Sequence, residues 1–243
     1  MGVDYSRLAA DYDAARANEA VDREFWLSGL KDLGHLASGE RILDLGSGTG
    51  RFARLLAEFA PVVALDASEE MLGRSKEKGD FARVRADAHR LPFRNDAFDA
   101  TVLMMVLHQL SDYPAALREV ARVSRRAVIA TTDMAERDLG ILGEAFPSLG
   151  EIDRSRFPPI PVLVAVLAAA GFRRVAVEAR SLSRSLPVRE QIERVRRKYI
   201  STLDLIPEAE FRHGLAFLER ELPHRFGATY ESTARFTFLG ASR

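Results

Sequence analysis

The sequence contains no cysteine. This absence excludes disulfides, thiolate metal sites and any mechanism that needs a cysteine nucleophile. It is compatible with a reducing compartment, and we expect a cytoplasmic protein with no bound metal.

Net charge and long apolar stretches are lacking as well. The 35 basic residues are balanced by 35 acidic residues, so the chain as a whole has no electrostatic attraction to nucleic acid or to an anionic membrane. The longest apolar run, Pro161–Gly171, has about half the length that crosses a bilayer. The stretch Met1–Arg16 carries charged side chains and no signal-peptide core. We therefore expect neither a membrane span nor a secretory segment.

The chain does contain an alternation of short apolar runs and amphipathic stretches. Its 243 residues, 47% of them hydrophobic, suit one large α/β unit. Strands are predicted at Arg41–Leu45, Val62–Asp66, Phe81–Ala86, Phe98–Met104 and Ala127–Thr132. Helices are predicted at Ser6–Ala17, Val21–Gly34, Phe52–Phe59, Ser68–Lys78 and Asp112–Val123. This alternation is typical of a parallel sheet covered by helices on both faces.

The pattern changes after Asp133. The stretch Met134–Pro159 is mixed and rich in acidic residues. Further along, the sequence predicts a helix at Ile160–Ala170, a strand at Phe172–Leu182, two helices within Leu186–Glu221 broken near Pro207, and a final strand at Tyr230–Gly240.

A glycine cluster follows the first predicted strand. Gly46, Gly48 and Gly50 form a turn between Leu45 and a helix that starts at about Arg51. Glycine lets the backbone bend tightly and approach a ligand, and the N–H groups at the helix start can face a carboxylate or phosphate. Such a turn alone is also compatible with a plain strand-to-helix connection.

Two further polar positions follow the next two strands. Asp66 ends the second strand, where a carboxylate can accept hydrogen bonds from both hydroxyls of a ribose. Asp87 and Ala88 follow the third strand, where a side-chain acceptor and a backbone N–H can contact an adenine edge. Because open parallel sheets bind ligands at the carboxyl ends of their strands, we expect these groups to share one nucleoside site.

These motifs together resemble a known family. The segments are Ile42–Gly50, Val63–Leu72, Ala86–Ala88, Leu91–Phe93 and Phe98–Asp99. In this order they resemble the class I S-adenosylmethionine-dependent methyltransferases of the small UbiE-like group, over about residues 38–133. The resemblance implies a Rossmann-like, doubly wound α/β sheet of seven strands, mostly parallel with an antiparallel last strand. It also implies an N-terminal helical lid and a helical insert before that last strand.

The resemblance further implies S-adenosylmethionine as cofactor, with S-adenosylhomocysteine as product. Gly46 and Gly48 would line its methionine part, Asp66 its ribose, and Asp87 its adenine. The implied cofactor-binding residues are Tyr12, Asp44, Gly46, Ser47, Gly48, Asp66, Ala67, Met71, Asp87, Ala88 and Met104. We predict one domain over residues 1–243, with a lid at 1–37, a cofactor-binding core at 38–133, and acceptor-site inserts at 134–159 and 186–225.

A nicotinamide-binding Rossmann enzyme is the main competing interpretation, since it also places an acid about twenty residues after the glycines. Its fingerprint requires a third glycine where this chain has Arg51. It also gives no reason for the Asp87-Ala88 and Leu91-Pro92-Phe93 motifs.

The acceptor remains open at this point. A small molecule is favoured, with His108 after the fourth strand as a candidate general base or a packing residue. RNA, such as tRNA, is an alternative because residues 173–198 hold nine basic and three acidic residues. A non-catalytic, cofactor-binding regulatory protein is a third. The Asn/Asp-Pro-Pro-aromatic signature of some amino-group methyltransferases is absent, since Met104-Met105-Val106 stands in its place.

Overall fold

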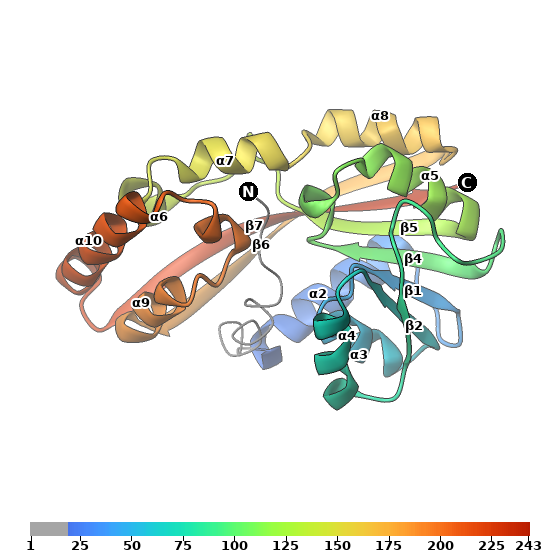
Figure 1. Ribbon diagram of the computed structural model, residues 1–243, viewed down its shortest axis with the longest axis horizontal. Helices are drawn as coiled ribbons and strands as arrows, with labels where there is room; N and C mark the ends of the chain where they lie inside the picture. The colour runs from blue at the N-terminus through green and yellow to red at the C-terminus, as the bar shows by residue number, and fades with distance from the viewer. Residues whose placement is uncertain (1–18) are drawn as a thin grey trace.

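A computed structural model describes residues 19–243 and shows one seven-stranded sheet in the order β3-β2-β1-β4-β5-β7-β6 (Figure 1). The strands are β1 (Ile42–Leu45), β2 (Val62–Asp66), β3 (Ala82–Arg85), β4 (Phe98–Met104), β5 (Ser124–Thr131), β6 (Arg174–Pro187) and β7 (Thr229–Ser242). Four pairings are parallel, and β7 is antiparallel to both of its neighbours. The predicted mostly parallel sheet with an antiparallel last strand is confirmed.

Helices cover both faces of this sheet, as the alternating pattern predicts. They are α2 (Glu19–Gly34), α3 (Arg51–Ala57), α4 (Glu69–Ser75), α5 (Tyr113–Val123) and α8 (Ile160–Ala170), with short 3-10 turns η2 (Lys76–Lys78) and η3 (Leu107–Gln109). One buried cluster packs α2 and α3 against the sheet, and a second packs α5 and α8 against the opposite face. The predicted helix Ser6–Ala17 lies outside the described residues.

The last two strands extend well beyond the rest of the sheet. β6 and β7 pair along their whole length, from Arg174 opposite Ser242 to Pro187 opposite Thr229, whereas β5 pairs only with residues 237–242 of β7. The projecting part of this ribbon carries α6 (Gly140–Ala145), α7 (Leu149–Arg156), α9 (Val188–Arg196), η4 (Ser201–Asp204) and α10 (Glu208–Phe226). These elements share a third buried cluster, which includes Phe146, Leu203 and Leu218, and they form a second lobe.

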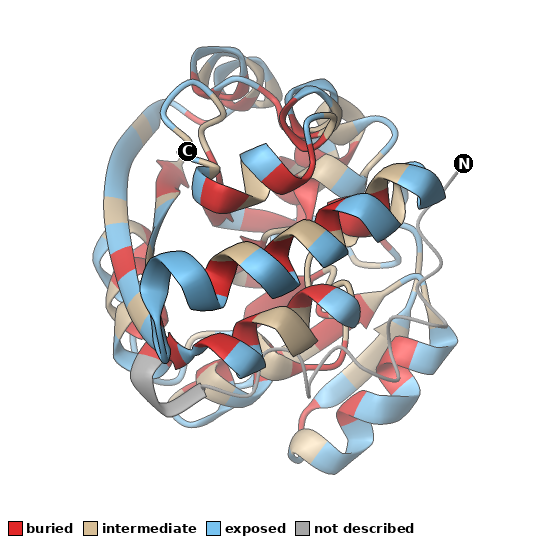
Figure 2. Cartoon of the chain, turned by 90° about the vertical axis from the view of Figure 1, so that its left-hand side faces the viewer, coloured by how far each residue is buried: buried red, intermediate tan, exposed pale blue. Residues whose placement is uncertain are grey.

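The second lobe differs most from the sequence prediction. The strand predicted at Phe172–Leu182 continues to Pro187, although residues 183–187 are not an apolar run; pairing with β7 sustains it. The mixed stretch after Asp133 contains α6 and α7, which were not predicted. The break near Pro207 is a connection between α9 and α10 that includes η4. Seen from the side of this lobe, the helices turn exposed residues outward and buried residues toward the ribbon (Figure 2).

Two arginines of β6 hold the N-terminal helix α2 against the ribbon. Arg180 donates to Asp32 at 2.8 Å and to Ser28 at 3.0 Å. Arg184 pairs with Asp22, which is 4% exposed. A buried carboxylate is stable only when it is paired and hydrogen-bonded, so these contacts fix how α2 lies between the sheet and the second lobe.

Gly240 of β7 allows the closest approach between the sheet and α2. A Cβ atom at this position would lie 1.9 Å from the backbone oxygen of Leu33, and a backbone atom cannot move aside as a side chain can.

We expect Gly240→Ala to lower the free energy of unfolding by about 3 kcal/mol, measured by urea denaturation. The control is Gly73→Ala on α4, where a Cβ meets nothing within 4 Å and helix propensity predicts a gain of up to about 1 kcal/mol. Equal effects of the two changes would contradict this account.

Candidate functional site

The glycine turn after β1 adopts a backbone conformation that ordinary residues avoid. Gly46, Gly48 and Gly50 have φ values of 71°, 54° and 79°, all in the left-handed region that favours glycine. A Cβ on Gly46 would lie 2.3 Å from Cγ2 of Val106, whereas one on Gly48 would meet nothing within 4 Å. The turn is therefore packed on one side and open above Gly48.

Asp66 links this turn to the end of β2. Its Oδ2 accepts a hydrogen bond from the Gly48 N–H at 2.8 Å, and its Oδ1 accepts one from the Ser68 N–H at 2.9 Å. The N–H groups of Gly46 and Ser47 donate to the Leu65 carbonyl at 2.8 and 3.0 Å. Because each carboxylate oxygen can accept about two hydrogen bonds, Asp66 keeps acceptor capacity for a ligand.

Asp44 is a buried carboxyl group just before the turn. It is 1% exposed, and its Oδ2 has no hydrogen-bond partner among the described residues. Burial raises the pKa of Asp44 to about 7, with a further contribution from the negative charge of Asp66, while the backbone N–H of Ala53 acts in the opposite direction. The neighbouring Ser47 Oγ is likewise buried without a described partner. Two polar side chains of the predicted site are thus left unsatisfied by the described part of the protein.

Asp87 lies exposed after β3 and is paired with His89. The His89 N–H donates to Asp87 Oδ1 at 2.9 Å, and the His89 ring Nδ1 lies 2.6 Å from the same oxygen. These contacts lower the pKa of Asp87, the backbone hydrogen bond most of all. The His89 side chain is 26% exposed.

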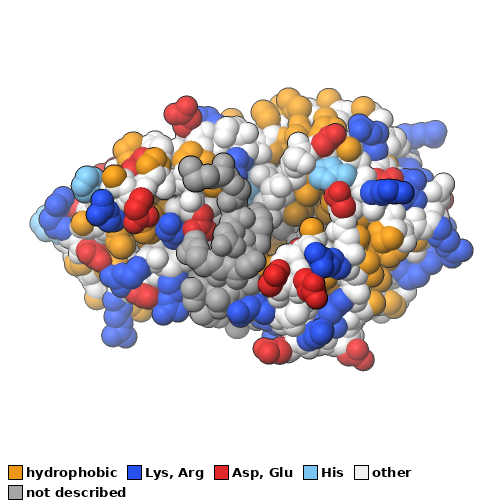
Figure 3. All heavy atoms as spheres, viewed as in Figure 1, with side chains coloured by type: hydrophobic (Ala, Val, Ile, Leu, Met, Phe, Trp, Pro, Cys, Tyr) orange, Lys and Arg blue, Asp and Glu red, His pale blue; other side chains and the backbone are white. Residues whose placement is uncertain are grey.

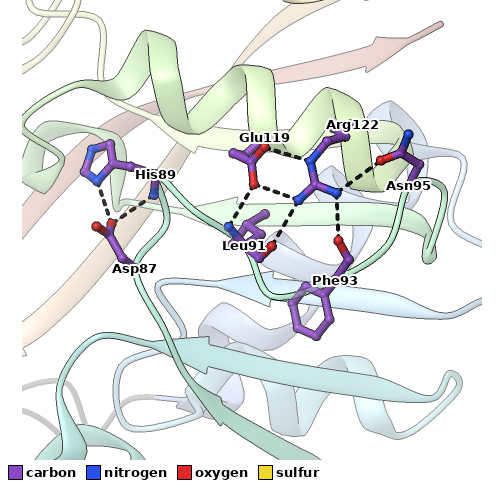
Figure 4. Close-up of polar contacts among 7 residues, drawn as sticks. All are labelled: Asp87, His89, Leu91, Phe93, Asn95, Glu119 and Arg122. Atoms are coloured by element: carbon purple, nitrogen blue, oxygen red, sulfur yellow. Dashed lines mark hydrogen bonds and ion pairs between the residues drawn. The ribbon is translucent and has the colours of Figure 1, made fainter.

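The loop that follows Asp87 is held on α5 by an ion pair (Figure 4). Glu119 accepts from the Leu91 N–H at 2.8 Å, and Arg122 donates to the carbonyls of Leu91 and Phe93 at 3.0 and 2.7 Å. Arg122 and Glu119 also bind each other at 2.7 Å. This Glu119–Arg122 pair was not predicted, because nothing in the helical pattern of the sequence marks these two charges as partners of a loop.

Ala67 and Met71 follow the end of β2, and Ala88 follows Asp87. Ala67 is exposed, whereas Met71 and Ala88 are buried. Ser68 caps α4 by accepting from the Met71 N–H at 3.2 Å, which fixes Met71 in the first turn of that helix. The structure therefore brings the predicted residues of strands β1, β2 and β3 to one edge of the sheet. Tyr12 lies outside the described residues.

Met104 ends β4 at the same edge and borders a cavity of about 670 Å³. Met105 follows with φ 53°, an unusual conformation for a residue other than glycine, and its N–H donates to the Ala130 carbonyl at 2.9 Å. His108 of η3 lines the cavity and stacks on Phe157, with ring centroids 4.1 Å apart and an angle of 14° between the planes.

The cavity lies between the sheet edge and the second lobe. Its walls come from α2, the start of α3, η3, the stretch before and within α6, α7, α9, η4, the end of α10 and the projecting ribbon. Aromatic side chains are prominent among them: Trp26, Phe52, Phe157, Tyr199, Phe226, Tyr230 and Phe236. Trp26 is 3% exposed and packs edge-to-face on Phe236 at 4.8 Å. Trp26 therefore belongs both to the buried core and to the cavity wall.

Most charges of the cavity wall are paired with each other. Arg235 binds Glu136 at 2.9 Å, and Arg137 pairs with Asp153, which is fully buried. Asp153 also accepts from the Thr202 hydroxyl. The cavity therefore combines an aromatic lining with ion pairs that are already satisfied within the protein.

The family model described as "Methyltransferase domain" matches residues 43–130. The demethylmenaquinone methyltransferase of Mycobacterium marinum is 34% identical over 123 residues, which are 50% of this chain and 53% of that protein. The malonyl-[acyl-carrier protein] O-methyltransferase of Methylococcus capsulatus is 31% identical over 196 residues, which are 77% of this chain and 70% of that protein. The chain belongs to the class I S-adenosylmethionine-dependent methyltransferases of the UbiE-like group.

Solved structures agree with this fold. A putative methyltransferase of Anabaena variabilis superimposes with a TM-score of 0.69 at 20% identity, covering 88% of this chain and 96% of that one. Phosphoethanolamine N-methyltransferase 2 of Haemonchus contortus, solved with S-adenosyl-L-methionine, gives 0.62 at 17% identity, covering 99% of this chain and 60% of that one. The chain spans 53 to 65% of the length of the first curated relatives that it matches.

The methyltransferase site is suited to the family's cofactor, S-adenosylmethionine. Its methionine part carries a cationic amino group, and the unsatisfied Asp44 carboxyl, two residues before the glycine turn, is compatible with such a group. Asp66 and Asp87 keep acceptor oxygens for hydroxyl and amino groups of an adenosine. Within residues 19–243, no three His, Cys, Asp or Glu side chains are grouped as a metal site would need. No helix in this range is long and apolar enough to span a membrane.

The buried Asp44 makes the stability of this methyltransferase depend on pH. The folded protein keeps the Asp44 proton up to about pH 7, whereas the unfolded chain releases it near pH 4. Stability therefore falls as pH rises through this window, by about 4 kcal/mol in the absence of cofactor. Urea denaturation between about pH 4 and pH 8 should show this loss relative to Asp44→Asn, which has no proton to release. In the control Asp80→Asn, at an exposed position, the free energy of unfolding should depend on pH as it does in the wild type. Parallel curves for wild type and Asp44→Asn would refute the assignment.

Proposed function

We propose that this chain transfers a methyl group from S-adenosylmethionine to a small-molecule acceptor bound in the cavity between the sheet and the second lobe. The observation that carries the proposal is the position of this cavity. It begins at Met104 and Met105, at the same sheet edge as the glycine turn, Asp66 and Asp87. An acceptor in it would lie beside a cofactor held by those residues.

The cofactor-binding roles form part of this proposal. Gly46, Ser47 and Gly48 would leave room for the methionine part, and Asp44 would face its amino group. Asp66 would accept from the ribose hydroxyls, while Asp87 and the backbone of Ala88 would contact the adenine. Ala67, Met71 and Met104 would pack along the adenosine, and we assign Tyr12 to the same site from the sequence alone.

Methyl transfer from S-adenosylmethionine requires little acid–base chemistry from the protein. S-adenosylmethionine, when bound, supplies a methyl group on a positively charged sulfur, which the acceptor atom displaces in line. The protein chiefly has to align the two reactants and exclude water. Trp26, Phe52 and Phe236 provide an apolar wall for this purpose. Three ion pairs, Arg184–Asp22, Arg137–Asp153 and Arg235–Glu136, balance part of the charge of the wall.

The RNA alternative finds less support. Five of the nine basic side chains of residues 173–198 pair with a carboxylate: Arg180, Arg184, Arg196, Arg197 and Lys198. Arg173 lies far from them in the fold, at the start of β6, whereas Arg196 lies at the end of α9. The segment therefore does not form one continuous basic surface for a polynucleotide. The named activities of the curated relatives, on demethylmenaquinone and on malonyl-[acyl-carrier protein], also favour a non-RNA acceptor.

Calorimetric titration with S-adenosylmethionine tests the proposal. We expect the wild type to bind S-adenosylmethionine saturably and not to bind NAD. Asp66→Ala should bind S-adenosylmethionine at least about 100-fold more weakly, because it loses charge-assisted hydrogen bonds to the ribose. The matched control Asp80→Ala should bind as the wild type does. Unchanged affinity in Asp66→Ala would refute the ribose assignment. S-adenosylhomocysteine formation with a panel of hydroxyl, amino and carboxyl acceptors then separates an enzyme from a cofactor-binding regulator, which would show no turnover.

His108 offers a separate test, because its stacking and its proton chemistry can be uncoupled. His108→Phe keeps a flat ring against Phe157 and should stay within about 1 kcal/mol of the wild type in stability, whereas His108→Ala should lose about 2 kcal/mol. If His108 is a general base, both variants lose about 100-fold or more in turnover once an acceptor is found. Full activity in His108→Phe would show that the residue only packs.

A further inference from the structure

Helix α8 has an unusual composition for a surface helix. All residues of Ile160–Ala170 are apolar, and none carries a polar side chain. Ile160, Leu163 and Leu167 are buried against the sheet. The opposite side of the helix is exposed and equally apolar: Pro161, Val162, Ala165, Ala168 and Ala169. A helix that is apolar all round is normally buried on every side, so this exposed side is suited to a further contact.

The neighbouring strand enlarges this surface. Val175 of β6 packs against the buried cluster of α5 and α8. Because alternate residues of a strand point to the same face, Val177 lies on that face as well. Val177 is 46% exposed and Val162 is 45% exposed, which makes them two of the three most exposed large hydrophobic residues among those described. We call these exposed residues of α8, together with Val177, the apolar face. In Figure 3 hydrophobic side chains gather at the top of the molecule, over α8.

Arginines lie beside the end of this helix. Arg173 follows α8 by three residues and donates its N–H to the Ser242 carbonyl at 2.8 Å, and the Arg243 N–H donates to the Arg125 carbonyl at 3.2 Å. Arg125, Arg243 and Arg173 thus lie side by side at the ends of β5, β7 and β6. The odd-numbered residues of these strands, such as Ile129, Leu239 and Val175, belong to the α5–α8 cluster. The three arginines therefore lie together at the end of the sheet that adjoins the C-terminal end of α8, and we call them the basic row.

The positive charge of the basic row is only partly balanced, although Asp99 lies close enough to Arg125 for that arginine to help lower the pKa of Asp99. Arg243 pairs with Asp96, but neither Arg125 nor Arg173 forms an ion pair with a carboxylate among residues 19–243. Residues 157–177 contain no Asp or Glu. Basic side chains are visible at this end of the molecule, near the C-terminus (Figure 3).

We propose that the apolar face and the basic row form a docking surface for an anionic phospholipid membrane. Apolar side chains of an interfacial helix enter the boundary between headgroups and acyl chains, while arginines beside it bind the phosphate groups. A second copy of the chain would fit less well. A two-fold contact would place one apolar face on the other and supply no carboxylate from residues 157–177 to the basic row. The overall neutrality of the chain does not oppose this binding, because the attraction acts over about 10 Å or less.

Co-sedimentation of the full chain with lipid vesicles tests this proposal without methyl donor or acceptor, so its outcome is independent of the proposed function. We expect binding to phosphatidylcholine vesicles with about one quarter phosphatidylglycerol, weak or no binding to pure phosphatidylcholine, and loss of binding at about 0.5 M salt. The double variant Arg125→Glu/Arg173→Glu should bind at least about 25-fold more weakly, since each arginine near the surface contributes about fivefold. Val162→Asp should also lose binding.

Matched controls separate these effects from general changes in charge. Arg74→Glu, at an exposed arginine on α4, is the control for the arginine changes. Ala57→Asp, at an exposed alanine at the end of α3, is the control for Ala165→Asp on α8. Both controls should bind like the wild type, whereas Ala165→Asp should bind more weakly. Equal binding to both kinds of vesicle, no binding at all, or equal losses in controls and test variants would overturn the proposal. A wild-type dimer that Val162→Asp converts to a monomer in light scattering would overturn it as well, because a second copy would then cover the apolar face.

Discussion

The hydrogen bond from the Gly48 N–H to Asp66 joins the turn after β1 to the end of β2, and the geometry of the candidate site depends on it. It holds the turn in a conformation that only glycine adopts easily, and it orients the carboxylate along the sheet edge. The same arrangement leaves Asp44 buried behind the turn with an unsatisfied oxygen. A protein gains nothing in stability from such a group. Its presence is understandable if a ligand completes it, which ties the cost of this buried oxygen to cofactor binding.

A second constraint comes from the length of β6 and β7. Because these strands project beyond β5, they carry a separate hydrophobic core away from the sheet and create a cavity between the two cores. The pairs Arg180–Asp32 and Arg184–Asp22 then hold α2 across the junction. The cavity wall is therefore assembled from segments far apart in the sequence. Its shape depends on long-range ion pairs as much as on apolar packing.

The difference between local and long-range information explains what could be predicted. Strands such as Val62–Asp66 and Phe98–Met104 were predicted with their observed ends, because apolar runs bounded by turn residues mark buried parallel strands. The glycine turn and Asp66 were predicted for the same reason, since their spacing is local. The outer half of β6 was not, because its residues become a strand only by pairing with β7. The contacts of the Glu119–Arg122 ion pair with the loop at Leu91 and Phe93, and the cavity lining, likewise join distant segments, for which the sequence has no local signal.

The segment that matches the family and the residues that line the cavity are largely different parts of the chain. The family match ends at residue 130, next to the end of β5, and the cofactor candidates in the described part of the chain all precede that point. Of the described residues that line the cavity, only six fall within the matched segment: Arg51, Phe52, Met104, Met105, His108 and Gln109. The rest belong to α2, to the segment after β5 and to the second lobe with its ribbon. The cofactor half of the proposed reaction can therefore be inferred from relatives, whereas the acceptor half cannot. Acceptor choice must be read from the aromatic walls and ion pairs of this chain itself.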